Sequence, residues 1–144
     1  MTERHTEEEA FVSLQKTADA LMQGIAVLLK PAGLSATQYN VLRILRGAGK
    51  DGLACGEIGV RMITRDPDIT RLLDRLETRG LVTRARELKD RRVITARITK
   101  DGLRMLKELD APIQRYHESQ LGHMGEKKLV ELIWLLELAR RPSI

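Results

Sequence analysis

Arginine side chains gather in one stretch of this sequence, which runs from Ile63 to Ile98. A guanidinium is planar, stays charged and donates hydrogen bonds in a fixed fork, and this geometry suits phosphate oxygens. A stretch that presents such groups from a helix and a turn is therefore a candidate for contact with a nucleic-acid backbone. The arginines of the stretch are Arg65, Arg71, Arg75, Arg79, Arg84, Arg86, Arg91 and Arg92.

The first part of the stretch has the period of an amphipathic helix. Its apolar residues follow the spacing i, i+3, i+4 and i+7, which places them on one side of a helix. Asp66 suits the N-cap, Pro67 suits the first helical position, and Gly80 suits the C-terminal end. We therefore expect a helix over Pro67–Arg79. Its apolar stripe consists of Ile69, Leu72, Leu73 and Leu76.

The second part of the stretch changes to the period of β-strands. Residues Leu81–Arg86 and Val93–Ile98 are expected to form two short strands, joined by the polar tip Glu87–Arg92. A capped helix followed at once by a hairpin with a basic tip predicts a recognition helix and a β-wing.

Two further helices are expected before the recognition helix. Ser35 is a good cap for a helix over Ala36–Arg46, and a third helix over Cys55–Met62 follows a glycine-rich turn. Two short helices joined by a few residues, the second with arginines on its polar side, have the arrangement of a helix-turn-helix.

Both ends of the chain are expected to be helices with surplus apolar surface. Thr6–Leu29 carries a seven-residue apolar repeat, typical of a helix that packs on another helix. Thr99 caps another long helix, which Gly122 and Gly125 interrupt. The last helix, Glu126–Arg140, is apolar on more than one face, which predicts a homodimer built from the chain ends. The inward residues of the helix after Thr99 are expected to be Leu103, Leu106, Leu109, Ile113 and Tyr116.

Together these elements predict a mostly α fold with a small β-hairpin wing, a winged helix-turn-helix with N- and C-terminal dimerisation helices. We expect one domain over residues 1–144. Within it, residues 1–33 and 101–144 supply the dimerisation helices, and residues 34–100 form the winged DNA-binding part.

Composition excludes several classes of function. The net charge of +5 favours a polyanionic partner, and the aromatic content of 3% argues against binding single strands by base stacking. A single cysteine allows no intrachain disulfide, and no apolar run resembles a signal peptide or a membrane span, so we expect a cytoplasmic protein with no membrane partner. Neither metal-ligand spacing nor a nucleophile–base pair is evident, so no metal, cofactor or enzymatic activity is expected.

Five segments, in this order, resemble the MarR family of winged-helix repressors, the multiple-antibiotic-resistance regulators. The resemblance implies an obligate homodimer that binds a pseudo-palindromic operator in double-stranded DNA. It also implies release from DNA when a small aromatic or anionic ligand binds. The segments are LSATQYNVLRIL (Leu34–Leu45), EIGVRM (Glu57–Met62), ITRLLDRLETRGLVTR (Ile69–Arg84), DRR (Asp90–Arg92) and ITKDG (Ile98–Gly102).

The family pattern assigns roles to individual residues. Thr70 and Arg71 match the start of the recognition helix, which faces phosphates and base edges in the major groove. Asp90 and Arg92 match the wing pair, in which the acid orients an arginine that enters the minor groove. Asp68 departs from the small polar residues of relatives, although it could accept a hydrogen bond from cytosine. The full predicted DNA-binding set is Arg65, Asp68, Thr70, Arg71, Arg75, Arg84, Arg86, Asp90, Arg91 and Arg92.

An inducer site is predicted between the long helices and the winged part. Two alternatives remain open at this point. Cys55 could make the chain a thiol-based oxidation sensor, or the winged helix could be a protein–protein adaptor that no longer binds DNA. The residues expected to line the inducer site are Phe11, Gln15, Tyr39 and Arg43.

Overall fold

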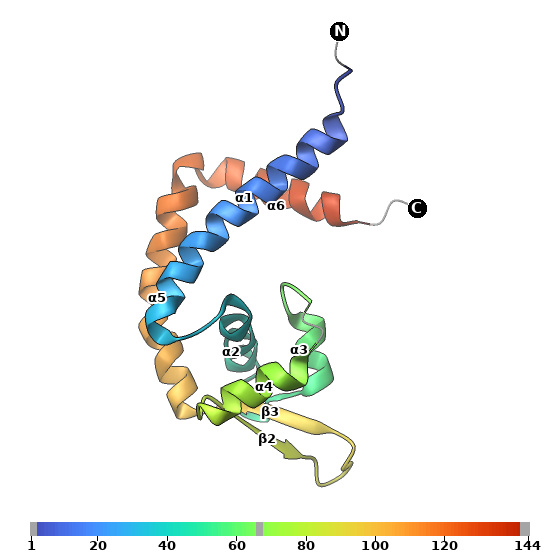
Figure 1. Cartoon of the computed structure of the whole chain (residues 1–144), viewed down its shortest axis with the longest axis vertical. Coiled ribbons are helices and arrows are strands. Elements are labelled where there is room, and N and C mark those ends of the chain that lie inside the picture. The colour runs from blue at the N-terminus through green and yellow to red at the C-terminus, as the bar shows by residue number, and fades with distance from the viewer. Residues whose placement is uncertain (1–2, 66–67, 142–144) are drawn as a thin grey trace.

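The computed structural model describes residues 3–65 and 68–141 and has two parts (Figure 1). The long helices α1 (Thr6–Leu29) and α5 (Lys100–Leu121) lie side by side, and α6 (Glu126–Arg140) crosses near them. The winged part lies near the N-terminal end of α5, away from α6, and contains α2, α3, α4 and a small sheet. The predicted fold class, mostly helical with a hairpin wing, is confirmed.

Helix α2 spans Ala36–Ala48 and begins with a complete capping box. The Ser35 hydroxyl accepts from the backbone N–H of Gln38 at 3.1 Å, and the Gln38 side chain accepts from the backbone N–H of Ser35 at 3.0 Å. The predicted start is therefore confirmed, whereas the helix ends two residues beyond the expected Arg46.

The helix-turn-helix consists of α3 (Cys55–Arg61) and α4 (Ile69–Thr78). Helix α4 begins later than the sequence suggested, because Asp68 is its N-cap and accepts the backbone N–H of Arg71 at 2.9 Å. The expected cap Asp66 and first helical residue Pro67 lie outside the described residues. Within the described residues, α4 begins at Ile69 and ends at Thr78, one residue before the expected Arg79.

The sheet has the strand order β1-β3-β2, with all pairs antiparallel. Strands β2 (Val82–Arg86) and β3 (Ile94–Ile98) form the predicted wing hairpin, with Val82 opposite Ile98. Strand β1 (Leu53–Ala54) was not predicted, because two residues are too few to show the alternation of a strand. Strand β1 covers one edge of β3 and anchors the hairpin to the segment after α2.

One hydrophobic core lies where α2, α4, α5 and the sheet meet. Thr99 caps α5 as predicted, accepting the backbone N–H of Gly102 at 3.1 Å. Leu103, expected to face inward, is instead 41% exposed, because it lies outside the side of α5 that carries the buried residues. The fully buried large side chains are Leu29, Leu42, Leu45, Ile58, Leu73, Leu76, Leu106, Val41 and Val82.

The two terminal helices contribute little to this core. Helix α6 has no buried residue among those described, and α1 buries only Leu29. Within the described residues, no single helix is long and apolar enough to cross a membrane. The bent pair Thr6–Ala32 and Ala36–Asp51 reaches the necessary length and apolar character only when the two segments are taken together.

Candidate nucleic-acid interface

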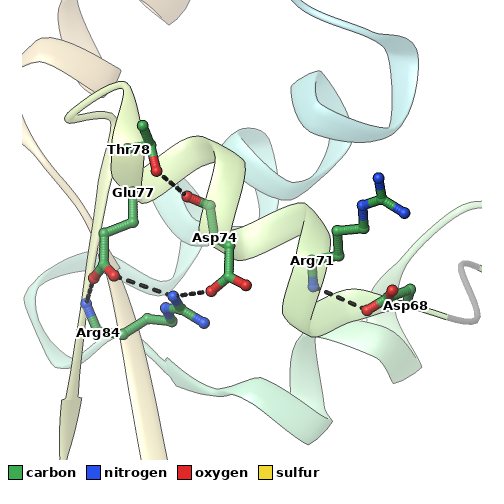
Figure 2. Close-up of polar contacts among 6 residues, drawn as sticks. All are labelled: Asp68, Arg71, Asp74, Glu77, Thr78 and Arg84. Carbon is green, nitrogen blue, oxygen red and sulfur yellow. Dashed lines mark hydrogen bonds and ion pairs between the residues drawn. The ribbon is translucent and has the colours of Figure 1, made fainter.

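The outward face of α4 presents polar and basic side chains at its N-terminal half. Leu72, Leu73 and Leu76 fix the rotation of the helix by packing into the core. Thr70, Arg71 and Arg75 are consequently exposed. Figure 2 shows the Arg71 guanidinium pointing away from the helix and from the neighbouring carboxylates. Neither Arg71 nor Arg75 has a side-chain partner within the part of the chain that the structure describes.

Arg84 on β2 connects the wing to α4 (Figure 2). Its guanidinium pairs with the carboxylates of Asp74 and Glu77, the latter at 3.1 Å, and its backbone N–H donates to Glu77 at 2.8 Å. Only 18% of the Arg84 side chain is exposed. Arg84 is one of the predicted DNA contacts, and here its guanidinium faces the two acids of α4, which neutralise its charge.

At the tip of the wing, an acidic residue holds an arginine out into solvent. Asp90 accepts hydrogen bonds from the Arg92 side chain at 3.1 and 3.3 Å and from its backbone N–H at 3.1 Å. These bonds lower the pKa of the Asp90 carboxyl, so the pair stays charged at a lower pH than an isolated aspartate would. The Arg92 side chain is 91% exposed, and the pairing therefore orients it without burying it.

The remaining arginines predicted to contact DNA are Arg65, Arg86 and Arg91. The Arg86 guanidinium donates to the Arg91 carbonyl at 2.8 Å, which fixes the turn and leaves the Arg91 side chain exposed at the tip. Arg65 is exposed just before α4. The structure thus brings Arg91 and Arg92 together on the wing and Thr70, Arg71 and Arg75 on α4.

A second candidate site is a cavity of about 470 Å³ between α2 and α5. Tyr39 and Arg43, two of the residues predicted for the inducer site, line it, with the Arg43 guanidinium 5.8 Å from the centre of the Tyr39 ring. Burial raises the pKa of Tyr39, which therefore remains a neutral phenol. Phe11 and Gln15, the other two residues predicted for the inducer site, are exposed on α1 and do not line this cavity.

Helix α5 also contributes to this cavity, which was not predicted. Asp110, Gln114 and His117 line it, and their spacing of four and three residues was a readable sign that they share a helix face. Asp110 also accepts two hydrogen bonds from Arg46, at 2.9 and 3.1 Å. This ion pair ties α2 to α5 beside the cavity.

An apolar groove of about 780 Å³ runs between α1, α5 and α6. Leu14, Leu21, Leu132 and Ile133 contribute to its walls. Beside it, exposed apolar side chains continue over the two terminal helices. The exposed large apolar residues of α1 and α6 are Phe11, Val12, Leu14, Met22, Val27, Val130, Ile133, Trp134, Leu135 and Leu138.

Cys55 is half-buried at the start of α3. Burial raises the pKa of its thiol above the ordinary value, and the positive charge of Arg84 offsets this only in part. The reactive form of cysteine is the thiolate, which this environment disfavours. The position of Cys55 therefore does not favour the oxidation-sensor alternative.

Comparison with known proteins gives matches over most of the chain. The sequence model of the MarR family matches residues 32–93. The homoprotocatechuate degradative operon repressor of Escherichia coli is 25% identical over 126 residues, which cover 88% of this chain and 84% of that protein.

Two solved structures are similar to this chain along its whole length. A MarR transcription factor from Planctomyces limnophilus is 42% identical, with a TM-score of 0.72 and coverage of 96% of this chain and 99% of that one. NadR in complex with 4-hydroxyphenylacetate has a TM-score of 0.78 at 24% identity, and the match covers 99% of this chain and 100% of that chain.

Replacing Arg84 tests the link between helix and wing. We expect Arg84→Ala to lower the free energy of unfolding by about 1–3 kcal/mol, because it removes charge-assisted hydrogen bonds to two carboxylates. Urea denaturation followed by circular dichroism measures the change. Arg75→Ala, which removes an unpaired arginine from α4, should change it by no more than about 0.5 kcal/mol. Equal effects of the two substitutions would show that the Arg84 link contributes nothing.

Proposed function

Because this chain belongs to the MarR family of transcription regulators, we propose that it is a homodimeric repressor of a pseudo-palindromic operator. Regulators of this family act by binding double-stranded DNA. In our proposal, α4 of each copy enters the major groove, and the wing between β2 and β3 reaches the flanking minor groove. Two half-sites would then lie about one helical turn apart, roughly 10 base pairs.

The observation that carries this proposal is the pair of outward-pointing arginines on linked supports. Arg71 projects from α4, and Asp90 holds Arg92 outward at the wing tip. Arg84 links α4 to the wing strand β2, so the separation of the helix and the wing is fixed before the protein binds DNA. Prior orientation lowers the side-chain entropy lost on binding. An A·T-rich minor groove, which concentrates negative potential, would favour insertion of Arg92.

The adaptor alternative predicts no binding to any duplex. Selection of bound sequences from a pool of random duplexes with the purified protein separates the two functions. The proposal requires enrichment of a sequence with twofold symmetry, and binding that weakens steeply as salt rises, because bound arginines release counterions.

We expect Arg92→Ala to weaken binding to the selected duplex by about tenfold or more while leaving the dimer intact. The loss arises because the wing no longer places a positive charge in the minor groove. Affinity measured by gel shift at several salt concentrations gives both the loss and the slope. Asp90→Asn should have a smaller effect, because it keeps the arginine and removes only its charged partner.

The matched control is Arg104→Ala on α5, which removes one exposed arginine from outside the proposed interface. Its affinity at each salt concentration should equal that of the wild type. If Arg92→Ala and Arg104→Ala bind equally well, the role proposed for the wing is wrong.

The proposed homodimer rests on the apolar surface of the chain ends. Helix α6 has no buried residue in the described chain, although it contains Ile133, Trp134 and Leu135. An exposed apolar surface that is continuous with a groove is typical of a subunit interface. Residues 1–33 and 101–144 would therefore supply the dimer contact, and residues 34–100 the contact with DNA.

We expect Ile133→Glu to produce monomers and to abolish operator binding, because a carboxylate would be buried against the second subunit without a partner. Light scattering coupled to gel filtration measures the mass. Lys127→Ala, an exposed position on the same helix, should remain dimeric. A wild-type protein that elutes as a monomer would rule out the proposed assembly.

The cavity between α2 and α5 is the proposed inducer site. It offers the cation of Arg43, the phenol of Tyr39 and the imidazole of His117, and these groups suit a small aromatic acid. Support comes from the solved NadR complex with 4-hydroxyphenylacetate and from the relative named for a homoprotocatechuate degradative operon.

We expect 4-hydroxyphenylacetate or a related aromatic acid to raise the melting temperature of the wild type and to release it from DNA. A ligand at about 100 times its Kd adds about 2.7 kcal/mol of stability. Arg43→Ala should lose the shift, because the carboxylate loses its cation, and Arg115→Ala on α5 should keep it. A panel of aromatic acids that shifts neither protein would count against this site.

A further inference from the structure

Arg79, directly after α4, joins the end of this helix to a distant part of the chain. Its guanidinium donates to the carbonyl oxygen of Ala32 at 2.8 Å and to that of Gly33 at 2.9 Å. Its backbone N–H also donates to the Arg75 carbonyl, so the residue completes the last turn of α4. One side chain thus connects segments that are 46 and 47 residues apart.

The two carbonyls lie in the connection between α1 and α2, which we call the elbow and define as Lys30–Ser35. A short 3₁₀ turn, η1 (Lys30–Ala32), continues α1, and Gly33 then reverses the chain with a left-handed φ of 67°. The directions of the two helices differ by 77° across this break. Carbonyls at a helix end lack N–H partners and carry partial negative charge, which explains why a guanidinium binds there.

The segment before α4 and the middle of α4 are held by contacts with α2 and β2. The backbone N–H of Ile63, ahead of the helix, donates to the Asn40 side chain of α2 at 2.9 Å. The middle of α4 is held to β2 through Asp74 and Glu77. Within the described residues, the polar side-chain contacts between α4 and the elbow both come from Arg79.

We infer that Arg79 is a positioning residue that sets the angle between the recognition helix α4 and the terminal helix α1. The inference rests on the proposed dimeric DNA-binding function, in which α1 belongs to the subunit interface. A change of angle at the elbow moves the two α4 helices of a dimer symmetrically about the twofold axis. Arg79 therefore controls the separation of half-sites that the dimer accepts, although it touches no DNA itself.

The test measures the preference for half-site separation. A duplex selected with the wild type from a random pool is remade with one base pair added or removed between its half-sites. We expect the wild type to bind the original about tenfold more tightly than either altered duplex, a penalty of the size of one mismatch. For Arg79→Ala the preference should shrink to about threefold or less, because the angle of α4 is no longer fixed.

The salt dependence of binding separates positioning from direct contact. Because Arg79 binds carbonyls and not phosphate in this inference, the slope of affinity against salt should be the same in Arg79→Ala and the wild type. Arg79→Lys keeps the charge but loses the two-pronged donor, so it should restore the spacing preference only in part. Arg104→Ala, which removes the same charge elsewhere, should retain the wild-type preference.

The possible results distinguish failure of the proposed function from failure of the inference about Arg79. If the wild type binds no duplex, the proposed function fails and this inference fails with it. If the wild type discriminates spacing and Arg79→Ala discriminates equally, only the inference about Arg79 is overturned. A salt slope reduced by about one, with the spacing preference unchanged, would make Arg79 a phosphate contact and overturn it as well. Should Arg79→Ala not form a folded dimer by circular dichroism and light scattering, the same comparison with Arg79→Lys decides.

Discussion

The attachment of Arg84 to Asp74 and Glu77 is the contact on which the geometry of the winged part depends. A two-stranded hairpin is marginally stable by itself, and its direction relative to a helix is not set by its own hydrogen bonds. The ion pair between α4 and β2 helps to fix that direction together with the buried side chains Val82 and Ala96, while β1 supports the opposite edge of the hairpin. The grooves of DNA lie at fixed intervals, so groups that enter adjacent grooves must keep a constant separation.

The arginines discussed above fall into two groups, those that bind groups of the protein itself and those that face outward. Arg46, Arg79 and Arg84 bind carboxylates or carbonyls of the protein and hold helices in place. Arg71 and Arg92 face outward from supports that those contacts fix. The net charge of the chain does not distinguish the two groups. An arginine that is hydrogen-bonded within the protein adds the same positive charge as an exposed arginine.

Much of the fold could be predicted from the sequence, because helix ends and apolar periodicity are local signals. Ser35 and Thr99 cap the helices expected of them, and the wing strands have nearly the expected bounds. What failed depended on contacts between distant segments. The partners of Arg84 lie seven and ten residues away, in another element, and no local pattern reveals whether such an arginine faces inward. The cavity between α2 and α5 likewise depends on how two distant helices pack, and the local pattern did not indicate that Phe11 lies outside it.

Helix α6 has no fully buried residue among those described, and this has a consequence for how such a regulator responds to its own abundance. If folding of the chain ends requires a second copy, the stability of the protein cannot be separated from its concentration. Below the dissociation constant of the pair, the amount of assembled regulator grows with the square of the amount synthesised. Control by this protein would then begin over a narrow range of expression, and a cell that makes half as much could lose far more than half of the repression.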